Sequence, residues 1–266
     1  MNRVISFASG KGGVGKTTLV SNLGWSWAKQ GNRVLLIDGD WGLGKLSIAL
    51  NAKPKKTIQD VLNGKVSVKD AVEPIAENLS LLASPSGIRG FEELDASMRQ
   101  QLYYQIEELK DQYDLVLLDH CSGVGWGVLE FAAASHQHVI VTTTEPTSYT
   151  DAYAIIKLLS QRFSVRDFLL VTTMSYQLAE TEVVMKRFVN WVVEQLGVRI
   201  ELIGILPWEP KVSEAICRQK PFIECFPRDP MAERLLRLGR KLKVSAVHPH
   251  HGLKFFYEGS REQLNP

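Results

Sequence analysis

Ten consecutive residues near the start of the chain have the types and spacing needed to hold a phosphate chain. They follow an apolar segment at residues 4–8 and read Ser9-Gly10-Lys11-Gly12-Gly13-Val14-Gly15-Lys16-Thr17-Thr18. Glycines let backbone N–H groups turn inward around phosphate oxygens, and the positive end of a following helix adds to that attraction. Lys16 supplies a point charge to the β- and γ-phosphates, and Thr17 offers a hydroxyl to Mg²⁺. The alternative is a glycine-rich turn that binds nothing, but the pattern in this setting predicts a P-loop that binds a nucleotide.

Three aspartates follow two further apolar segments. Asp38 and Asp40 come directly after residues 34–37, and Asp119 comes directly after residues 115–118. A carboxylate at the end of a strand near bound phosphates can hold Mg²⁺ directly or through water. A single such aspartate is usually a turn or helix cap. Three of them in a chain with a P-loop favour a metal-binding role over capping alone.

The elements that must position these residues alternate along the chain. Short segments rich in Val, Ile and Leu, typical of parallel strands covered on both faces, lie at residues 4–8, 34–38, 79–83, 115–119, 138–143, 168–172 and 202–206. Helical patterns lie between most of them, at residues 17–30, 92–110, 127–135, 150–163, 180–196 and 231–243. This alternation predicts an α/β protein with right-handed βαβ units. We expect a three-layer, doubly wound, mostly parallel sheet of about seven or eight strands, with helices on both faces and ligands at the carboxyl ends of the strands.

Composition limits the other possibilities. The 266 residues are 45% hydrophobic, which is enough for one substantial core. We predict a single P-loop domain over residues 1–244 and a polar C-terminal tail over residues 245–266. A net charge of +2 does not favour dedicated nucleic-acid binding. Three cysteines without a close pair indicate reduced thiols, and no apolar run approaches the roughly 20 residues that span a bilayer.

A second lysine, Lys11, directly follows the first glycine of the loop. With this lysine the loop resembles that of the deviant P-loop ATPases, the MinD/ParA superfamily. The resemblance implies ATP or ADP and Mg²⁺ as cofactors, and an ATP-dependent homodimer in which Lys11 reaches the phosphates held by the other subunit. It also implies that Lys11, Lys16 and Asp40 are catalytic, with Asp40 orienting the attacking water. The implied Mg²⁺ ligands are Thr17, Asp38 and Asp119, the last as the Walker B carboxylate. A solvated lysine on a loop is the alternative for Lys11.

The binding site for the base is less clear from the sequence. Many members of this superfamily carry an asparagine where this chain has Thr172 and Thr173. A threonine can hydrogen-bond a base, but it lacks the paired donor and acceptor of an amide. The loop after the last predicted strand is expected to cover the base through Pro207 and Glu209. Trp208 in that loop is either a stacking surface or part of the core.

A second resemblance is narrower. The chain is similar over residues 3–243 to the FlhG (FleN) type of MinD-like ATPase, most specifically at Glu145-Pro146-Thr147-Ser148-Tyr149-Thr150-Asp151-Ala152-Tyr153-Ala154-Ile155-Ile156-Lys157. This resemblance implies an ATP-dependent molecular switch that hydrolyses ATP slowly and regulates flagellar number or placement. The implied partners are an FlhF-like GTPase, flagellar switch proteins or a transcription regulator. The implied location is the cytoplasm, either free or peripheral at the inner face of the cytoplasmic membrane or the cell pole.

The sequence is also compatible with other functions. The same loop serves MinD- and ParA-type proteins that position division sites or DNA, and a scaffold that holds ATP without hydrolysing it would carry it too. The chain starts two residues before its first predicted strand, without the N-terminal extension by which many FlhG proteins stimulate FlhF. Direct stimulation of FlhF is therefore not expected. His120, next to Asp119, is either a packed neutral imidazole or a group that titrates near neutral pH.

Two surface features also allow two interpretations. The tail has Leu253, Phe256 and Tyr257 near one face of a weakly amphipathic segment that would give weak membrane contact. Alternatively, the tail docks back on its own fold through Phe255 and Phe256. The predicted helix at 231–243 carries a basic face, which indicates either a DNA-binding stripe or the solvated side of a core helix.

Overall fold

The computed structural model describes residues 3–40, 44–85, 95–245 and Phe255. In these residues eight strands form one sheet, in the order β3-β4-β2-β5-β1-β6-β7-β8. All neighbouring strands are parallel except β3 and β4, which are antiparallel. The strands are β1 (Arg3–Ser9), β2 (Val34–Gly39), β3 (Val72–Ala76), β4 (Leu79–Leu82), β5 (Leu115–Ser122), β6 (Gln137–Thr142), β7 (Asp167–Ser175) and β8 (Arg199–Pro207). The mostly parallel α/β sheet predicted from the sequence is confirmed.

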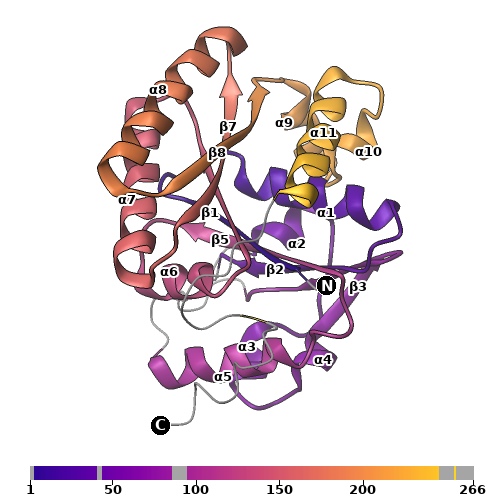
Figure 1. Cartoon of the computed structure of the whole chain (residues 1–266). Helices are drawn as coiled ribbons and strands as arrows, with labels where there is room; N and C mark the ends of the chain where they lie inside the picture. Colours follow the sequence, from indigo (N-terminus) through magenta and orange to yellow (C-terminus); the bar gives the residue numbers. More distant parts are fainter. Residues whose placement is uncertain (1–2, 41–43, 86–94, 246–254, 256–266) are drawn as a thin grey trace.

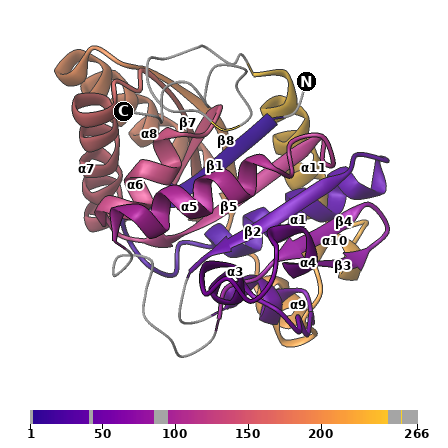
Figure 2. The same ribbon diagram turned by 90° about the horizontal axis from the view of Figure 1, so that it is seen from below.

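Helices cover both faces of the sheet, as Figure 1 and Figure 2 show. One face carries α1 (Lys16–Lys29), α2 (Lys45–Ala49), α9 (Lys211–Cys217), α10 (Phe222–Cys225) and α11 (Pro230–Val244). The other carries α3 (Ile58–Leu62), α4 (Val68–Ala71), α5 (Ala96–Glu107), α6 (Trp126–Ala133), α7 (Pro146–Phe163) and α8 (Leu178–Leu196). The molecule therefore has three layers.

The core follows from the two-residue period of the strands. In β2, Leu36 packs in the cluster that includes α1 and α11, whereas Leu35 packs in the cluster that includes α3 and α5. Both side chains are fully buried. Because helices cover both faces, every side chain along a central strand must be apolar or satisfied, which explains the continuous apolar runs in the sequence.

Several elements differ from the sequence prediction. The edge strand β3 was not predicted, because Glu73 and Pro74 interrupt its apolar pattern. The short helices α2, α3, α4, α9 and α10 were missed as well. Strand β5 continues three residues beyond Asp119, so this aspartate lies inside the strand and not at its end. Helix α7 begins at Pro146 and not at Thr150, with proline in the first turn where its missing N–H costs nothing.

The C-terminal part of the chain packs on the fold. In α11, Leu235, Leu238 and Leu242 are buried in the core, while its arginines face solvent, so the helix is a core helix with a basic outer side. Phe255 is fully buried: its ring stacks on Tyr103 at 4.6 Å, and its N–H donates to the carbonyl of Ala134. Phe255 thus docks on the fold, as one interpretation of the tail expected. The other tail residues of both interpretations lie outside the described residues.

Within the described ranges, no helix is long and apolar enough to cross a membrane.

Candidate nucleotide site

The loop between β1 and α1 has the backbone shape that its glycines allow. Gly13 and Gly15 adopt positive φ angles of 79° and 81°, a region that other residues rarely enter. Gly15 is also the N-cap of α1, so no side chain occupies the first backbone N–H groups of the helix. The first turn carries no acidic residue. These free N–H groups and the positive end of the helix form a site for an anion.

Lys16 and Thr17, at the start of α1, both bind the carboxylate of Asp119. Lys16 Nζ lies 2.8 Å from Asp119 Oδ1 and also donates to the carbonyl of His120. Thr17 Oγ1 donates to Asp119 Oδ2 at 2.6 Å. Lys16 and Asp119 are both buried. A buried ion pair is stable only with such satisfied geometry, so the structure brings together three residues that the sequence placed in one site.

A second buried carboxylate lies beside Asp119. Asp38 on β2 is the register partner of Asp119 on β5. It accepts hydrogen bonds from the backbone N–H of Asp40 at 3.0 Å and of Leu46 at 2.9 Å. Burial, and secondarily the negative charge of Asp119, raise the pKa of Asp38 to about 7. Two adjacent carboxylates in a dry site favour a bound cation.

The donor set suits Mg²⁺. A threonine hydroxyl and two carboxylates supply the hard oxygen ligands that this ion prefers, and Mg²⁺ usually takes only a few protein ligands, completing its shell with water and phosphates. Thr17, Asp38 and Asp119 are therefore the residues that would hold Mg²⁺ next to bound phosphates.

Asp40, the residue expected to orient water, is buried just beyond the end of β2. Its Oδ2 lies 2.6 Å from Lys45 Nζ at the start of α2. Lys45 also lines the cavity described below. The sequence analysis did not single out Lys45, although it follows Asp40 by five residues in a glycine-rich segment. In this conformation Asp40 is held by a cation from its own chain.

Lys11 is separate from the buried residues. Its side chain is 40% exposed and forms an ion pair with Glu145, the N-cap of α7. The neighbouring Gly10 touches the same helix so closely that a Cβ there would lie 2.3 Å from Asp151 Cβ. The start of α7 is therefore packed directly against the phosphate-binding loop. Nothing in the local sequence pattern predicted this contact.

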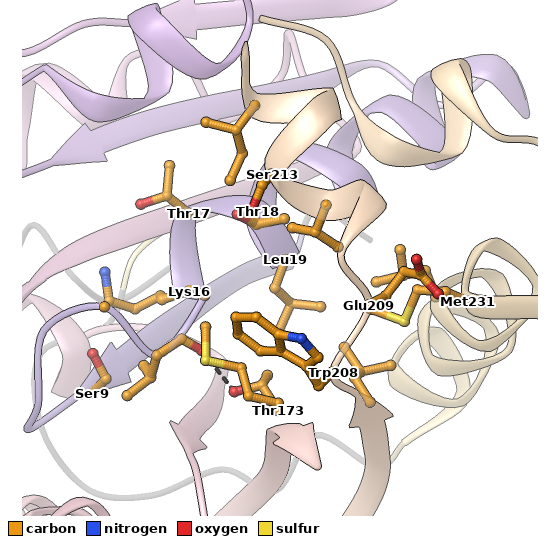
Figure 3. A pocket seen from close by; sticks show the side chains of 18 of the residues that line it. Ser9, Lys16, Thr17, Thr18, Leu19, Thr173, Trp208, Glu209, Ser213 and Met231 are labelled. Atoms are coloured by element: carbon orange, nitrogen blue, oxygen red, sulfur yellow. Dashed lines mark hydrogen bonds between the residues drawn. The ribbon is translucent and has the colours of Figure 1, made fainter. Parts of the chain in front are cut away.

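A cavity of about 340 Å³ adjoins the loop at the carboxyl ends of β1, β7 and β8. Figure 3 shows Lys16 and Thr17 at one side of it and Glu209 and Met231 at the other, with the indole of Trp208 between them. Pro207 and Glu209 line the cavity, as placed by the sequence analysis. Thr172 does not line it: this residue is fully buried in the sheet, and Thr173 and Met174 form the wall instead.

His120 lies next to Asp119 and is buried. Burial, and secondarily the charge of Lys16, lower the pKa of His120 to about 3. Its Nε2 atom has no hydrogen-bond partner among the described residues. The imidazole is therefore neutral at physiological pH, which favours the packed neutral reading.

The fold and the site together define a P-loop nucleotide-binding ATPase with a second lysine in its loop. A family model described as an AAA domain matches residues 2–166. The chain belongs to the MinD/ParA family of ATPases, as this match and the relatives below show.

Three characterised relatives match over most of the chain. The antiactivator FleN of Pseudomonas aeruginosa is 29% identical, over 96% of this chain and 92% of its own. The septum site-determining protein MinD of Synechocystis is 32% identical, over 84% of this chain and 82% of its own. The flagellum site-determining protein YlxH of Helicobacter pylori is 26% identical, over 96% of this chain and 88% of its own.

Solved structures agree with this fold. MinD in the MinC:MinD complex of Aquifex aeolicus has a TM-score of 0.73 at 29% identity, covering 94% of this chain and 98% of that one. MinD of Pyrococcus horikoshii, solved with Mg-ADP, has a TM-score of 0.74 at 25% identity, covering 92% of this chain and 97% of that one.

Proposed function

We propose that this protein is an ATP-dependent switch that hydrolyses ATP slowly at a dimer interface and regulates the number or placement of flagella. In the ATP-bound dimer, Lys11 of each subunit would reach the phosphates held by the other. The ATP-bound form is the active one, and hydrolysis acts as its timer. Mg²⁺ supplies charge neutralisation at the phosphates when it is bound.

The contrast between the two loop lysines carries this proposal. Lys16 is buried and pairs with Asp119 of its own chain, so it serves the nucleotide of its own subunit. The Lys11 side chain is 40% exposed, and among the described residues its ion-pair partner is the 62% exposed carboxylate of Glu145. An ion pair of this kind contributes little to stability, so Lys11 can exchange it at low cost for a phosphate on a second subunit.

The other ion pairs fit the same cycle. Lys16 would exchange Asp119 for the β- and γ-phosphates, which leaves both Asp119 oxygens for Thr17 and the cation. Asp40 would exchange Lys45 for a water molecule and accept its proton or hold it in line with the γ-phosphate. A site that must make these exchanges before it reacts is expected to turn over slowly without a partner.

Two observations support a flagellar role over other roles in the family. The relatives include an antiactivator, FleN, and a flagellum site-determining protein, YlxH. The segment 145–157, which carries the FlhG resemblance, packs on the phosphate-binding loop through Gly10 and Asp151. A partner bound on the outer side of α7 would therefore sense the loop. An FlhF-like GTPase, a flagellar switch protein or a transcription regulator is the partner we propose, met in the cytoplasm or at the inner face of the membrane.

The second candidate is a positioning ATPase of the MinD or ParA type, supported by the septum site-determining relative and its structures. A scaffold that binds ATP without hydrolysing it is a third. Turnover of wild type against Asp40→Ala separates the scaffold from both ATPases, because only a hydrolysing site loses activity when Asp40 is removed.

Partner binding tests the switch and the flagellar role together. Binding of purified candidate partners to the immobilised protein is measured in ATP and in ADP. The candidates are an FlhF-type GTPase, a flagellar switch protein, a flagellar transcription regulator and a MinC-type protein. We expect one flagellar protein to bind in ATP only, and Lys157→Ala on the exposed side of α7 to weaken it without changing ATP affinity. Equal binding in both nucleotides would make the protein a constitutive adaptor, and selective capture of the MinC-type protein would favour the second candidate.

A further inference from the structure

The cavity has two chemically different ends. The loop end presents glycine N–H groups, Lys16 and hydroxyls, with Met174 beside Gly15, whereas the rest of the lining is mainly apolar, with Leu206, Val212 and Ile216 next to the carboxylate of Glu209. Among the described residues that line the cavity, none is Asn, Gln or Arg. A nucleotide with its phosphates on the loop would place its base at this apolar end, where no side-chain amide can pair with it.

Trp208 stands at that end of the cavity. Its indole lies in the cavity in Figure 3 and is 45% exposed, although tryptophan is highly buried on average. Its backbone N–H donates to the carbonyl of Ser175 at 2.9 Å, which ties the loop after β8 to the end of β7. The backbone that carries the ring is thus hydrogen-bonded to the end of a strand of the sheet.

A second aromatic ring supports the first. Tyr176 stacks on Trp208 with ring centroids 5.8 Å apart and an interplanar angle of 26°. Tyr176 is itself 79% exposed, more than Trp208 at 45%, so burial does not explain its position. The two rings thus form a stacked pair, of which Trp208 lines the cavity.

One residue that lines the cavity has an unusual backbone conformation. Met174 has a positive φ of 55°, which is unusual for a side chain of this size. This backbone turn brings its terminal methyl group to 3.7 Å from the position of a Cβ on Gly15. Strain of this kind persists where the surrounding structure needs it, and it concentrates at ligand sites. Met174 therefore lines the cavity next to the phosphate-binding loop.

We propose that Trp208 is the stacking platform for the base of the bound nucleotide, with Tyr176 as its support, and that stacking takes the place of recognition by a side-chain amide. The inference rests on the proposed nucleotide-binding function. Every nucleobase presents a π-face, so an aromatic ring alone can hold it. A platform already held by Ser175 and Tyr176 loses little freedom on binding.

The test separates the base from the phosphates. Affinities of the full chain for Mg-ATP and for Mg-tripolyphosphate are measured by calorimetry in wild type, Trp208→Ala and Trp208→Phe. Stacking energies per base predict that Trp208→Ala weakens ATP binding by about 10- to 100-fold and leaves tripolyphosphate unchanged. Trp208→Phe keeps an aromatic face and should retain most of the ATP affinity. Trp191→Ala, which removes another half-exposed tryptophan on α8, is the matched control and should have no effect.

Two results would overturn the inference and leave the nucleotide site intact. One is an unchanged ATP affinity in Trp208→Ala. The other is an equal loss of affinity for ATP and for tripolyphosphate, which would indicate a structural role for the ring. Failure of wild type to bind either Mg-ATP or Mg-tripolyphosphate would instead reject the nucleotide site itself, and the platform with it.

Discussion

At the scale of single residues, the buried charged side chains of the site form ion pairs with other side chains of the same chain. Lys16 is paired with Asp119, and Asp40 is paired with Lys45. A buried charge without a partner is strongly unfavourable, so the nucleotide-free protein must neutralise its own binding groups. Residues of the site therefore affect both ligand binding and the stability of the free protein.

Substituting Lys16 tests this double role. Lys16→Ala should abolish ATP binding, because the lysine contacts phosphate. It should also destabilise the nucleotide-free protein by about 3 kcal/mol, because Asp119 stays buried without a cation. Calorimetry with Mg-ATP and urea unfolding measure the two effects, with Lys29→Ala on the exposed end of the same helix as control. Unchanged ATP affinity in Lys16→Ala would contradict the P-loop assignment.

Asp38 makes the free energy of unfolding of the nucleotide-free protein depend on pH. Its pKa is about 7 in the folded protein without ligands and near 3.9 in an unfolded chain. Between these values the folded state binds more protons, so the free energy of unfolding falls as pH rises from 4 to 7 and levels off above. The loss is about 4 kcal/mol in total. Urea unfolding across this range, without metal or nucleotide, should show a flatter curve for Asp38→Asn than for wild type; parallel curves would contradict the assignment.

At the scale of elements, the contact between α7 and the phosphate-binding loop is the feature that links the site to the surface. A Cβ on Gly10 would lie 2.3 Å from Asp151 Cβ and 3.0 Å from its backbone. The same addition at Gly12 would meet Ser122 Oγ at an ordinary 3.4 Å. Neighbouring glycines of one loop thus have different roles, the first in packing against α7.

Gly10→Ala should separate the loop from α7. We expect a loss of stability of about 1–3 kcal/mol from the forced contact, together with weaker ATP binding. Gly12→Ala, in the same loop, should cost clearly less in stability. Urea unfolding and calorimetry compare the two variants, and equal stability of both would mean that the Gly10 contact does not constrain α7. Asp151 is part of this contact, which makes exposed Lys157 the better probe of a partner.

The tail makes a separate prediction. Phe255 is fully buried against Tyr103 and Phe131. Phe255→Ala should therefore destabilise the protein by about 3–5 kcal/mol, whereas Val244→Ala at the exposed end of α11 should stay within about 0.5 kcal/mol. Chemical unfolding measures both. If the two variants were equally stable, the docking of Phe255 would not contribute to the fold.

The sequence predicted the elements better than their contacts. Central parallel strands are covered on both faces, so their apolar runs are visible without a structure. The edge strand β3 has only one neighbour and tolerates Glu73 and Pro74, which hides it. The pairing of Lys11 with Glu145 joins residues 134 positions apart, and no local period encodes such a contact. Likewise, the base end of the cavity depends on how β7 and β8 end side by side.

At the scale of the whole molecule, all of these groups lie on one side of the sheet, toward the carboxyl ends of its parallel strands. The loop after β1 and the cavity walls from β7 and β8 lie at the carboxyl ends of their strands, and Asp38 and Asp119 lie in the second halves of β2 and β5. Lys11, whose side chain is 40% exposed, lies in the loop after β1 at this side of the sheet. A nucleotide can shift a monomer–dimer equilibrium only through a difference in its affinity for the two states. Lys11 is the group that would supply this difference, since its contact with the γ-phosphate of a second subunit exists only in the dimer.

The oligomeric state in saturating Mg-ATP is the measurement that tests this account most directly. Sedimentation velocity compares Asp40→Ala, which should bind ATP without hydrolysing it, with the double variant that also carries Lys11→Ala, and with Lys53→Ala in place of Lys11→Ala as a surface-charge control. We expect Asp40→Ala and the Lys53 control to be dimers in ATP and monomers in ADP, and the Lys11 variant to stay monomeric in both. A monomer of Asp40→Ala under saturating ATP, or a dimer that forms without Lys11, would contradict the account.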